Sequence, residues 1–165
     1  MNIDTIIAEA TGLFTGRLWT ANNNSFYGRI FRNEDEKNHS AKILPLVATA
    51  NDKYIDVLKD VSKDAQCFFD VLPNVKMIGW MEENTVRAMF MVNLSKLYPT
   101  HTRIQATEAA KKEVYNILSS VFDRVDNCVT GYTAFSDYQW KQADEADVSP
   151  HYLFRYDCTS FNTNC

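Results

Sequence analysis

The chain has 165 residues, of which 45% are hydrophobic and 23% charged, and its formal net charge is −4. This size and composition are typical of a globular protein, so we expect a single domain over residues 1–165. An acidic chain is not expected to wrap a phosphate backbone. No stretch approaches the roughly 20 apolar residues that span a bilayer, and the first residues lack the pattern of a signal peptide. We therefore expect a reduced, soluble and intracellular protein without a membrane partner.

The first part of the chain predicts a helix and a hairpin. In residues 2–14, apolar side chains recur at three- and four-residue spacings, as in a short amphipathic helix. Residues 17–32 place two apolar and aromatic arms on either side of Asn22-Asn23-Asn24. Asparagine tolerates the left-handed backbone of tight turns. We therefore expect a protruding hairpin over residues 17–32, followed by a polar loop over 33–40.

The middle of the chain predicts strands separated by less regular segments. Residues 41–49 are apolar but contain Pro45, so they form an edge strand or a loop packed on the core. Residues 51–65 place apolar side chains on one helical face and predict a short helix. Residues 65–73 then predict a strand, and residues 74–84 predict either a connection or a second hairpin arm.

A strand that leads to a long helix forms the centre of the predicted fold. Residues 85–94 are apolar on both faces, which is typical of a strand near the centre of a covered sheet or at an interface. Thr102 and Gln105 have the spacing of a capping box at the start of the helix. The expected apolar stripe of this helix consists of Ile104, Ala110, Val114, Ile117, Leu118, Val121 and Phe122.

The last part of the chain predicts two further strand regions. Residues 129–140 are rich in strand-forming residues, residues 141–150 form a hydrophilic loop, and residues 151–161 alternate as a final strand. The tail, from about residue 160 to 165, is polar. The elements together predict an α+β fold: a mostly antiparallel sheet with one long helix packed across it, a short N-terminal helix and a protruding hairpin.

The residues that most often carry enzyme or metal chemistry form no recognisable motif. The histidines lie in or beside predicted loops, without the helical spacing of a zinc site; they are His39, His101 and His151. The acidic clusters lie in polar loops, where carboxylates are normally solvated; they are Glu82-Glu83 and Asp144-Glu145-Asp147. Asp70 lies within a predicted buried strand and needs a partner, and a structural pair is favoured over catalysis. We expect no metal, no cofactor and no enzymatic activity.

Nucleophile and nucleic-acid patterns are equally weak. The cysteines lack a catalytic signature, and a buried free cysteine usually acts as a small hydrophobe; the internal ones are Cys67, Cys128 and Cys158. The five glycines form no phosphate-binding loop. The predicted hairpin mixes arginines with aromatic residues, a mixture compatible with binding a single nucleic-acid strand, but the acidic residues that follow it oppose this. The mixed residues are Arg17, Trp19, Phe26, Tyr27, Arg29 and Arg32.

The order of a leading helix, a long hairpin, central strands and one long helix resembles phage tail-terminator (tail-completion) proteins. Two segments are more specific. VNLSKLYPTHTRIQATEAAKKEVYNIL (92–118) and PHYLFRYDCTSFNTNC (150–165) are similar to neck or tail ring proteins of crAss-like and related Bacteroidales phages. The resemblance implies a non-enzymatic virion protein that forms a homo-oligomeric ring at the head–tail connection. It also implies contact with adjacent portal, neck or tail ring proteins, and genomic DNA that passes through the ring without specific binding.

A ring requires a heterologous interface, in which one patch of each subunit meets a different patch of the next. The expected contacts are the predicted hairpin over 17–32 and the segment 133–149. The candidate interface residues are Trp19, Phe26, Tyr27, Arg29, Phe31, Tyr138 and Trp140. Two other hypotheses stay open: a cytoplasmic protein-binding adaptor, and a small hydrolase or nuclease that uses carboxylates such as Asp70 or Glu82.

Overall fold

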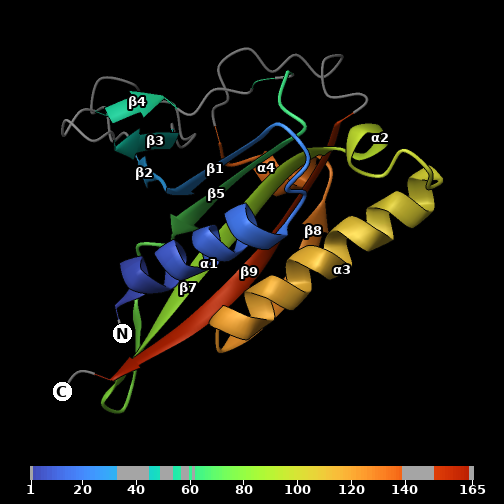
Figure 1. The fold of residues 1–165 in the computed structure, drawn as a ribbon. Helices are drawn as coiled ribbons and strands as arrows, with labels where there is room; N and C mark the ends of the chain where they lie inside the picture. Colours follow the sequence, from blue (N-terminus) through green and yellow to red (C-terminus); the bar gives the residue numbers. More distant parts are fainter. Residues whose placement is uncertain are drawn as a thin grey trace.

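A computed structural model describes residues 2–32, 45–48, 54–56, 60, 62–138 and 151–163 of the chain. These residues form an α+β fold with a six-stranded sheet and a separate three-stranded sheet (Figure 1). The strands are β1 (Asn24–Arg29), β2 (Phe31–Arg32), β3 (Pro45–Ala48), β4 (Tyr54–Asp56), β5 (Ala65–Val71), β6 (Lys76–Ile78), β7 (Met81–Asn93), β8 (Arg124–Thr130) and β9 (His151–Thr163). The helices are α1 (Ile3–Arg17), α2 (Leu94–Leu97), α3 (Arg103–Val121) and α4 (Tyr132–Phe135). The α+β prediction is therefore confirmed.

Strand β7 lies at the centre of the large sheet, whose order is β1-β5-β7-β9-β8 with β6 also paired to β7. It pairs antiparallel with β5 on one side and along all of its residues with β9 on the other. Its two faces contribute to different hydrophobic clusters, with Phe90 in one and Met89 and Met91 in the other. The prediction of a strand buried on both faces is confirmed.

Helices α1 and α3 lie side by side across one face of the sheet (Figure 1). The ring of Phe14 on α1 packs 5.4 Å from Phe90 and 6.0 Å from Phe69, measured between ring centroids. The predicted N-terminal helix and the predicted long helix are confirmed as α1 and α3, and Thr102 and Gln105 form the expected reciprocal capping box. Ile104 is the exception in the predicted stripe, because it is 75% exposed. It lies two residues, and about 200° of helix rotation, from the buried Ala106, so it points away from the sheet.

Part of the opposite face of the sheet packs against α4. The prediction of strand over all of residues 129–140 is wrong, because β8 ends at Thr130 and the helix follows Gly131. Gly131 has a φ of +74°, a conformation that L side chains rarely adopt, and it turns the chain out of the strand. Phe135 then packs its ring edge against Phe68 of β5. Two aromatic residues of the predicted strand, Phe135 in α4 and Tyr138 after it, thus pack in the cluster that contains Met89 and Met91, which we call the second core.

The hairpin predicted over residues 17–32 is wrong. Helix α1 extends to Arg17, β1 pairs parallel with β5, and β2 pairs with β3 in the small sheet. The asparagine turn instead joins α1 to β1, where the Asn24 side chain donates to the backbone oxygen of Trp19. A different hairpin is present at β6 and β7, so residues 74–84 contain both arms of a hairpin, where the sequence predicted either a connection or one arm.

Two further predictions from the middle of the chain need correction. Strand β3 is not at an edge but between β2 and β4, with Pro45 as its first residue, where a proline is tolerated. Residues 54–56 form β4 and not a helix. The predicted loops over 33–40 and 141–150 lie outside the described residues. Within the ranges that the structure covers, no helix is long and apolar enough to cross a membrane.

Candidate interaction site

A hairpin formed by β6 and the start of β7 exposes large hydrophobic side chains. Ile78 pairs with Met81, so the connecting turn consists of Gly79 and Trp80. Gly79 has a φ of +64°, which suits a tight two-residue hairpin turn. Four apolar residues at this hairpin are exposed, and Trp80 is the most exposed at 66%; they are Val75, Met77, Ile78 and Trp80. We call these four residues the apolar tip.

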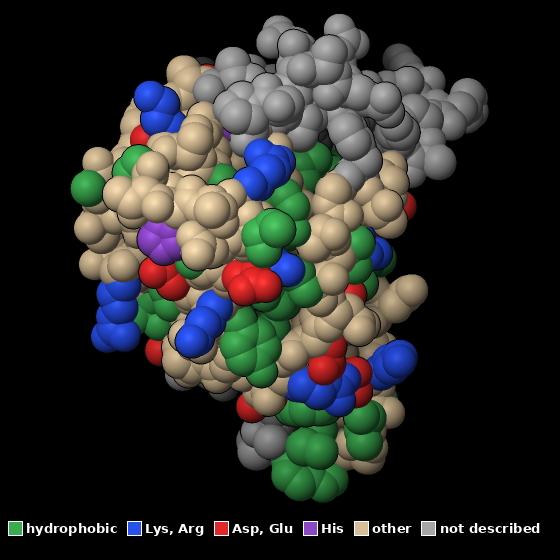
Figure 2. All heavy atoms as spheres, turned by 90° about the vertical axis from the view of Figure 1, so that its right-hand side faces the viewer, with side chains coloured by type: hydrophobic (Ala, Val, Ile, Leu, Met, Phe, Trp, Pro, Cys, Tyr) green, Lys and Arg blue, Asp and Glu red, His purple; other side chains and the backbone are tan. Residues whose placement is uncertain are grey.

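The position of the apolar tip follows from the unequal strand lengths. Strand β5 pairs with β7 only as far as Val71 opposite Val86, whereas β7 continues to Met81. The chain between them turns out beyond the end of β5 and returns as β6. The hairpin therefore projects from one end of the sheet (Figure 1), and hydrophobic side chains gather at that lower end of the molecule in Figure 2.

Charged residues border the apolar tip. Lys76 lies opposite Glu83 across the hairpin, and Glu83 lies 3.9 Å from the Arg124 guanidinium. Arg124 in turn donates to Asp126 at 2.6 Å. An apolar centre with an exposed tryptophan and a polar rim is the usual composition of a protein–protein interface. The apolar tip is therefore the strongest candidate interaction site among the described residues.

The predicted interface residues do not form one exposed surface. Trp19 is buried and donates from Nε1 to the Tyr98 hydroxyl at 2.8 Å, and Tyr138 is also buried. Phe26 packs on the cluster that contains Phe90, and Tyr27 packs on the second core around Met89 and Met91. Trp19 and Tyr138 are therefore not available to a neighbour in this conformation, whereas Phe26 and Tyr27 are only partly buried. Trp140 lies outside the described residues.

The remaining two predicted interface residues, Arg29 and Phe31, lie together. The Arg29 guanidinium donates to Asp4 of α1 at 2.5 Å and stands 5.4 Å from the centroid of the Phe31 ring. Phe31 is 39% exposed, so this pair is accessible but small. The signal for the larger site was present in the sequence as four large apolar residues around a glycine turn, within the segment 74–84.

Asp70 is buried and hydrogen-bonded to another side chain of the fold. Its carboxylate is buried and accepts a hydrogen bond from the Tyr138 hydroxyl at 2.5 Å. Burial raises the pKa of Tyr138, and the negative charge of Asp70 adds to that rise. Arg87 lies directly opposite Asp70 in the sheet and donates to Asp137 at 2.8 Å. The expected structural partner of Asp70 thus includes a tyrosine, which the sequence did not indicate.

The histidines and cysteines are dispersed. His151 is buried with its Nε2 3.3 Å from the backbone oxygen of Lys63, His101 is exposed, and His39 lies outside the described residues. Cys67 is buried and Cys128 exposed, and burial raises the pKa of both thiols. No group of three metal-ligating side chains occurs in the part of the chain that the structure describes.

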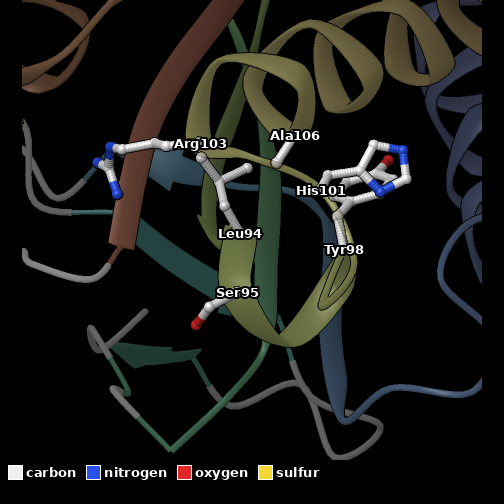
Figure 3. A pocket seen from close by; sticks show the side chains of 6 residues that line it. All are labelled: Leu94, Ser95, Tyr98, His101, Arg103 and Ala106. Carbon is white, nitrogen blue, oxygen red and sulfur yellow. The ribbon is translucent and has the colours of Figure 1, made fainter.

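A hollow of about 110 Å³ lies between α2 and the start of α3. Its apolar floor consists of Leu94 and Ala106, which are both 2% exposed. Figure 3 shows Arg103 and His101 on opposite sides of this floor. The capping box engages the backbone amides of Thr102 and Gln105 at the start of α3. The hollow itself offers an apolar base with Arg103 and His101 at its rim.

Compared with known protein families, curated proteins and solved structures, the chain matches none of them.

Proposed function

We propose that this protein is a non-enzymatic virion protein whose subunits form a homo-oligomeric ring in the neck or tail of a phage. The observation that carries the proposal is the apolar tip, a projecting hairpin with an exposed tryptophan. Exposed tryptophan is a common centre of protein–protein binding energy. The sequence resemblance of residues 92–118 and 150–165 to neck and tail ring proteins supports the choice of a virion.

The subunit scaffold is compatible with this role. One face of the large sheet packs against α1 and α3, and part of the other face packs against α4, so the sheet from which the hairpin projects has a packed core. The ring joins adjacent portal, neck or tail ring proteins, and the net charge of −4 lets DNA pass without strong binding.

Mass spectrometry of purified phage particles tests the proposal. The protein is expected in particles at a fixed copy number relative to the major capsid protein, after a density gradient that removes free phage proteins. A phage protein made during infection but not packaged serves as the negative control. If the chain is abundant in infected cells, absent from particles and recovered with a non-structural partner, it is an adaptor and the virion proposal is wrong.

A further inference from the structure

We infer that the apolar tip of one subunit docks into the hollow between α2 and α3 of a second copy of the same chain. This inference rests on the proposed function, because a ring needs two different patches on each subunit. The tip and the hollow would be those patches. Their pairing makes the interface heterologous, and the same interface is repeated between successive subunits.

The two patches lie at opposite ends of one strand. The hairpin turn precedes β7 directly, and α2 follows it directly. A strand of 13 residues spans roughly 40 Å. A subunit with complementary patches this far apart joins copies head to tail, and it closes into a ring when the rotation between neighbours permits.

The tip and the hollow are both apolar at their centres. The tip presents a protruding indole ring at Trp80, and the hollow presents an apolar floor of Leu94 and Ala106. The hollow's rim contains His101 and Tyr98, whose rings can pack beside an indole. A tryptophan entering an apolar hollow buries surface that water otherwise contacts on both partners.

The charges of the two patches are opposite in sign. In the paired part of the hairpin, residues 76–83, two carboxylates outnumber Lys76; they are Glu82 and Glu83, and Glu83 also lies 3.9 Å from the Arg124 guanidinium of β8. The hollow carries Arg103 at its rim and the exposed Lys96 on the adjacent helix α2, and these two cations outnumber Glu113, which accepts a hydrogen bond from the rim residue Tyr98. Opposite charges around an apolar contact favour a fixed orientation, whereas two hairpins facing each other would bring like charges together. The tip-to-hollow pairing is thus favoured over a tip-to-tip pairing.

The test uses two variants of the full chain, each with one defective patch. Trp80→Ala removes the indole from the tip, and Arg103→Glu reverses the charge at the hollow. Glutamate suits the first turn of a helix, so the second variant keeps α3 stable. Each variant alone is expected to weaken self-association about 30-fold in analytical ultracentrifugation. Tyr115→Ala and Lys112→Glu are matched controls on exposed positions of α3 and are expected to associate as the native chain does.

Mixing the two variants tests whether the tip of one subunit pairs with the hollow of another. In the mixture, the intact tip of Arg103→Glu meets the intact hollow of Trp80→Ala, so dimers with one copy of each variant are expected. Such dimers cannot grow, since their free ends are both defective. Native association that is insensitive to both variants, or a mixture that restores no dimer, overturns the inference. A native chain that stays monomeric up to concentrations on the order of 1 mM also overturns it. Particle composition tests the proposed function separately, because a packaged protein can still fail the mixing experiment.

Discussion

Replacement of Tyr138 by phenylalanine removes only the hydroxyl group and should lower the free energy of unfolding of the subunit. The hydroxyl of Tyr138 donates at 2.5 Å to the carboxylate of Asp70, and both side chains are buried. Phenylalanine keeps the ring that packs 5.7 Å from Phe68 and 6.3 Å from Phe135, so the change isolates the hydrogen bond. The Tyr138→Phe variant thus reports how much the buried carboxylate depends on this donor.

The expected loss follows from the charge and burial of the acceptor. A hydrogen bond to a charged group contributes about 1.5 to 3 kcal/mol, and Asp70 keeps other interactions, so a loss of about 2 kcal/mol is expected. For a chain of this size, that loss lowers the midpoint of thermal unfolding by about 4 to 8 °C. Chemical denaturation, with the free energy of unfolding extrapolated to water, is the measurement.

Tyr27→Phe is the matched control. The Tyr27 hydroxyl accepts a bond from the Gln66 amide at 3.4 Å, which is long and involves no charge. Its removal should change the free energy of unfolding by about 0.5 kcal/mol. If both variants lose the same free energy of unfolding, the hydrogen bond from Tyr138 to Asp70 contributes no more than a neutral one. The claim that the buried carboxylate depends on this donor is then refuted. A Tyr138→Phe variant that folds but loses self-association would instead return Tyr138 to the interface, as the sequence first suggested.

Three further measurements check other parts of the structure. Thr102→Ala removes one half of the capping box and should lower the free energy of unfolding by about 1 kcal/mol, whereas Thr102→Ser should restore it. Iodoacetamide should label Cys128 before Cys67 in the native chain, and peptide mass spectrometry after denaturation should show both. Burial raises the pKa of Tyr98 and Tyr156, so their protonated forms stabilise the fold fully below about pH 10 and less as pH rises further. Tyrosinate absorbance should accordingly develop at higher pH in the native than in the denatured chain, and equal midpoints would contradict the burial of these rings.

Helices and strands in which the apolar residues recur with a regular period over many residues were predictable from the sequence. The alternation across β7 and the apolar spacing along α3 each extend over many residues, and the capping-box residues mark the start of the helix. Such patterns are local, so they survive in any tertiary context that buries one face. The strand at residues 151–161 was predictable for the same reason, because its apolar residues alternate throughout.

The errors arose where partners are distant or segments are short. Residues 17–32 have hairpin composition, but β1 finds its partner in β5, about 40 residues later in the chain, as the pairing of Asn24 with Ala65 shows. Strand β4 has three residues, too few for a period to distinguish strand from helix. The four apolar residues of the tip are visible in the sequence, but their exposure depends on how far β7 extends beyond β5, which no local pattern encodes. The hollow likewise depends on the angle between α2 and α3.

The position of β9 has a consequence for how the chain is made. In space β9 lies between β7 and β8, yet it is synthesised after both of them. During translation β8 therefore has no neighbour in the large sheet, and one edge of β7 stays unpaired until residues 151–163 emerge from the ribosome. An open strand edge beside apolar side chains invites pairing with other chains. A chain cut before residue 151 should consequently accumulate in inclusion bodies, even though it retains both long helices.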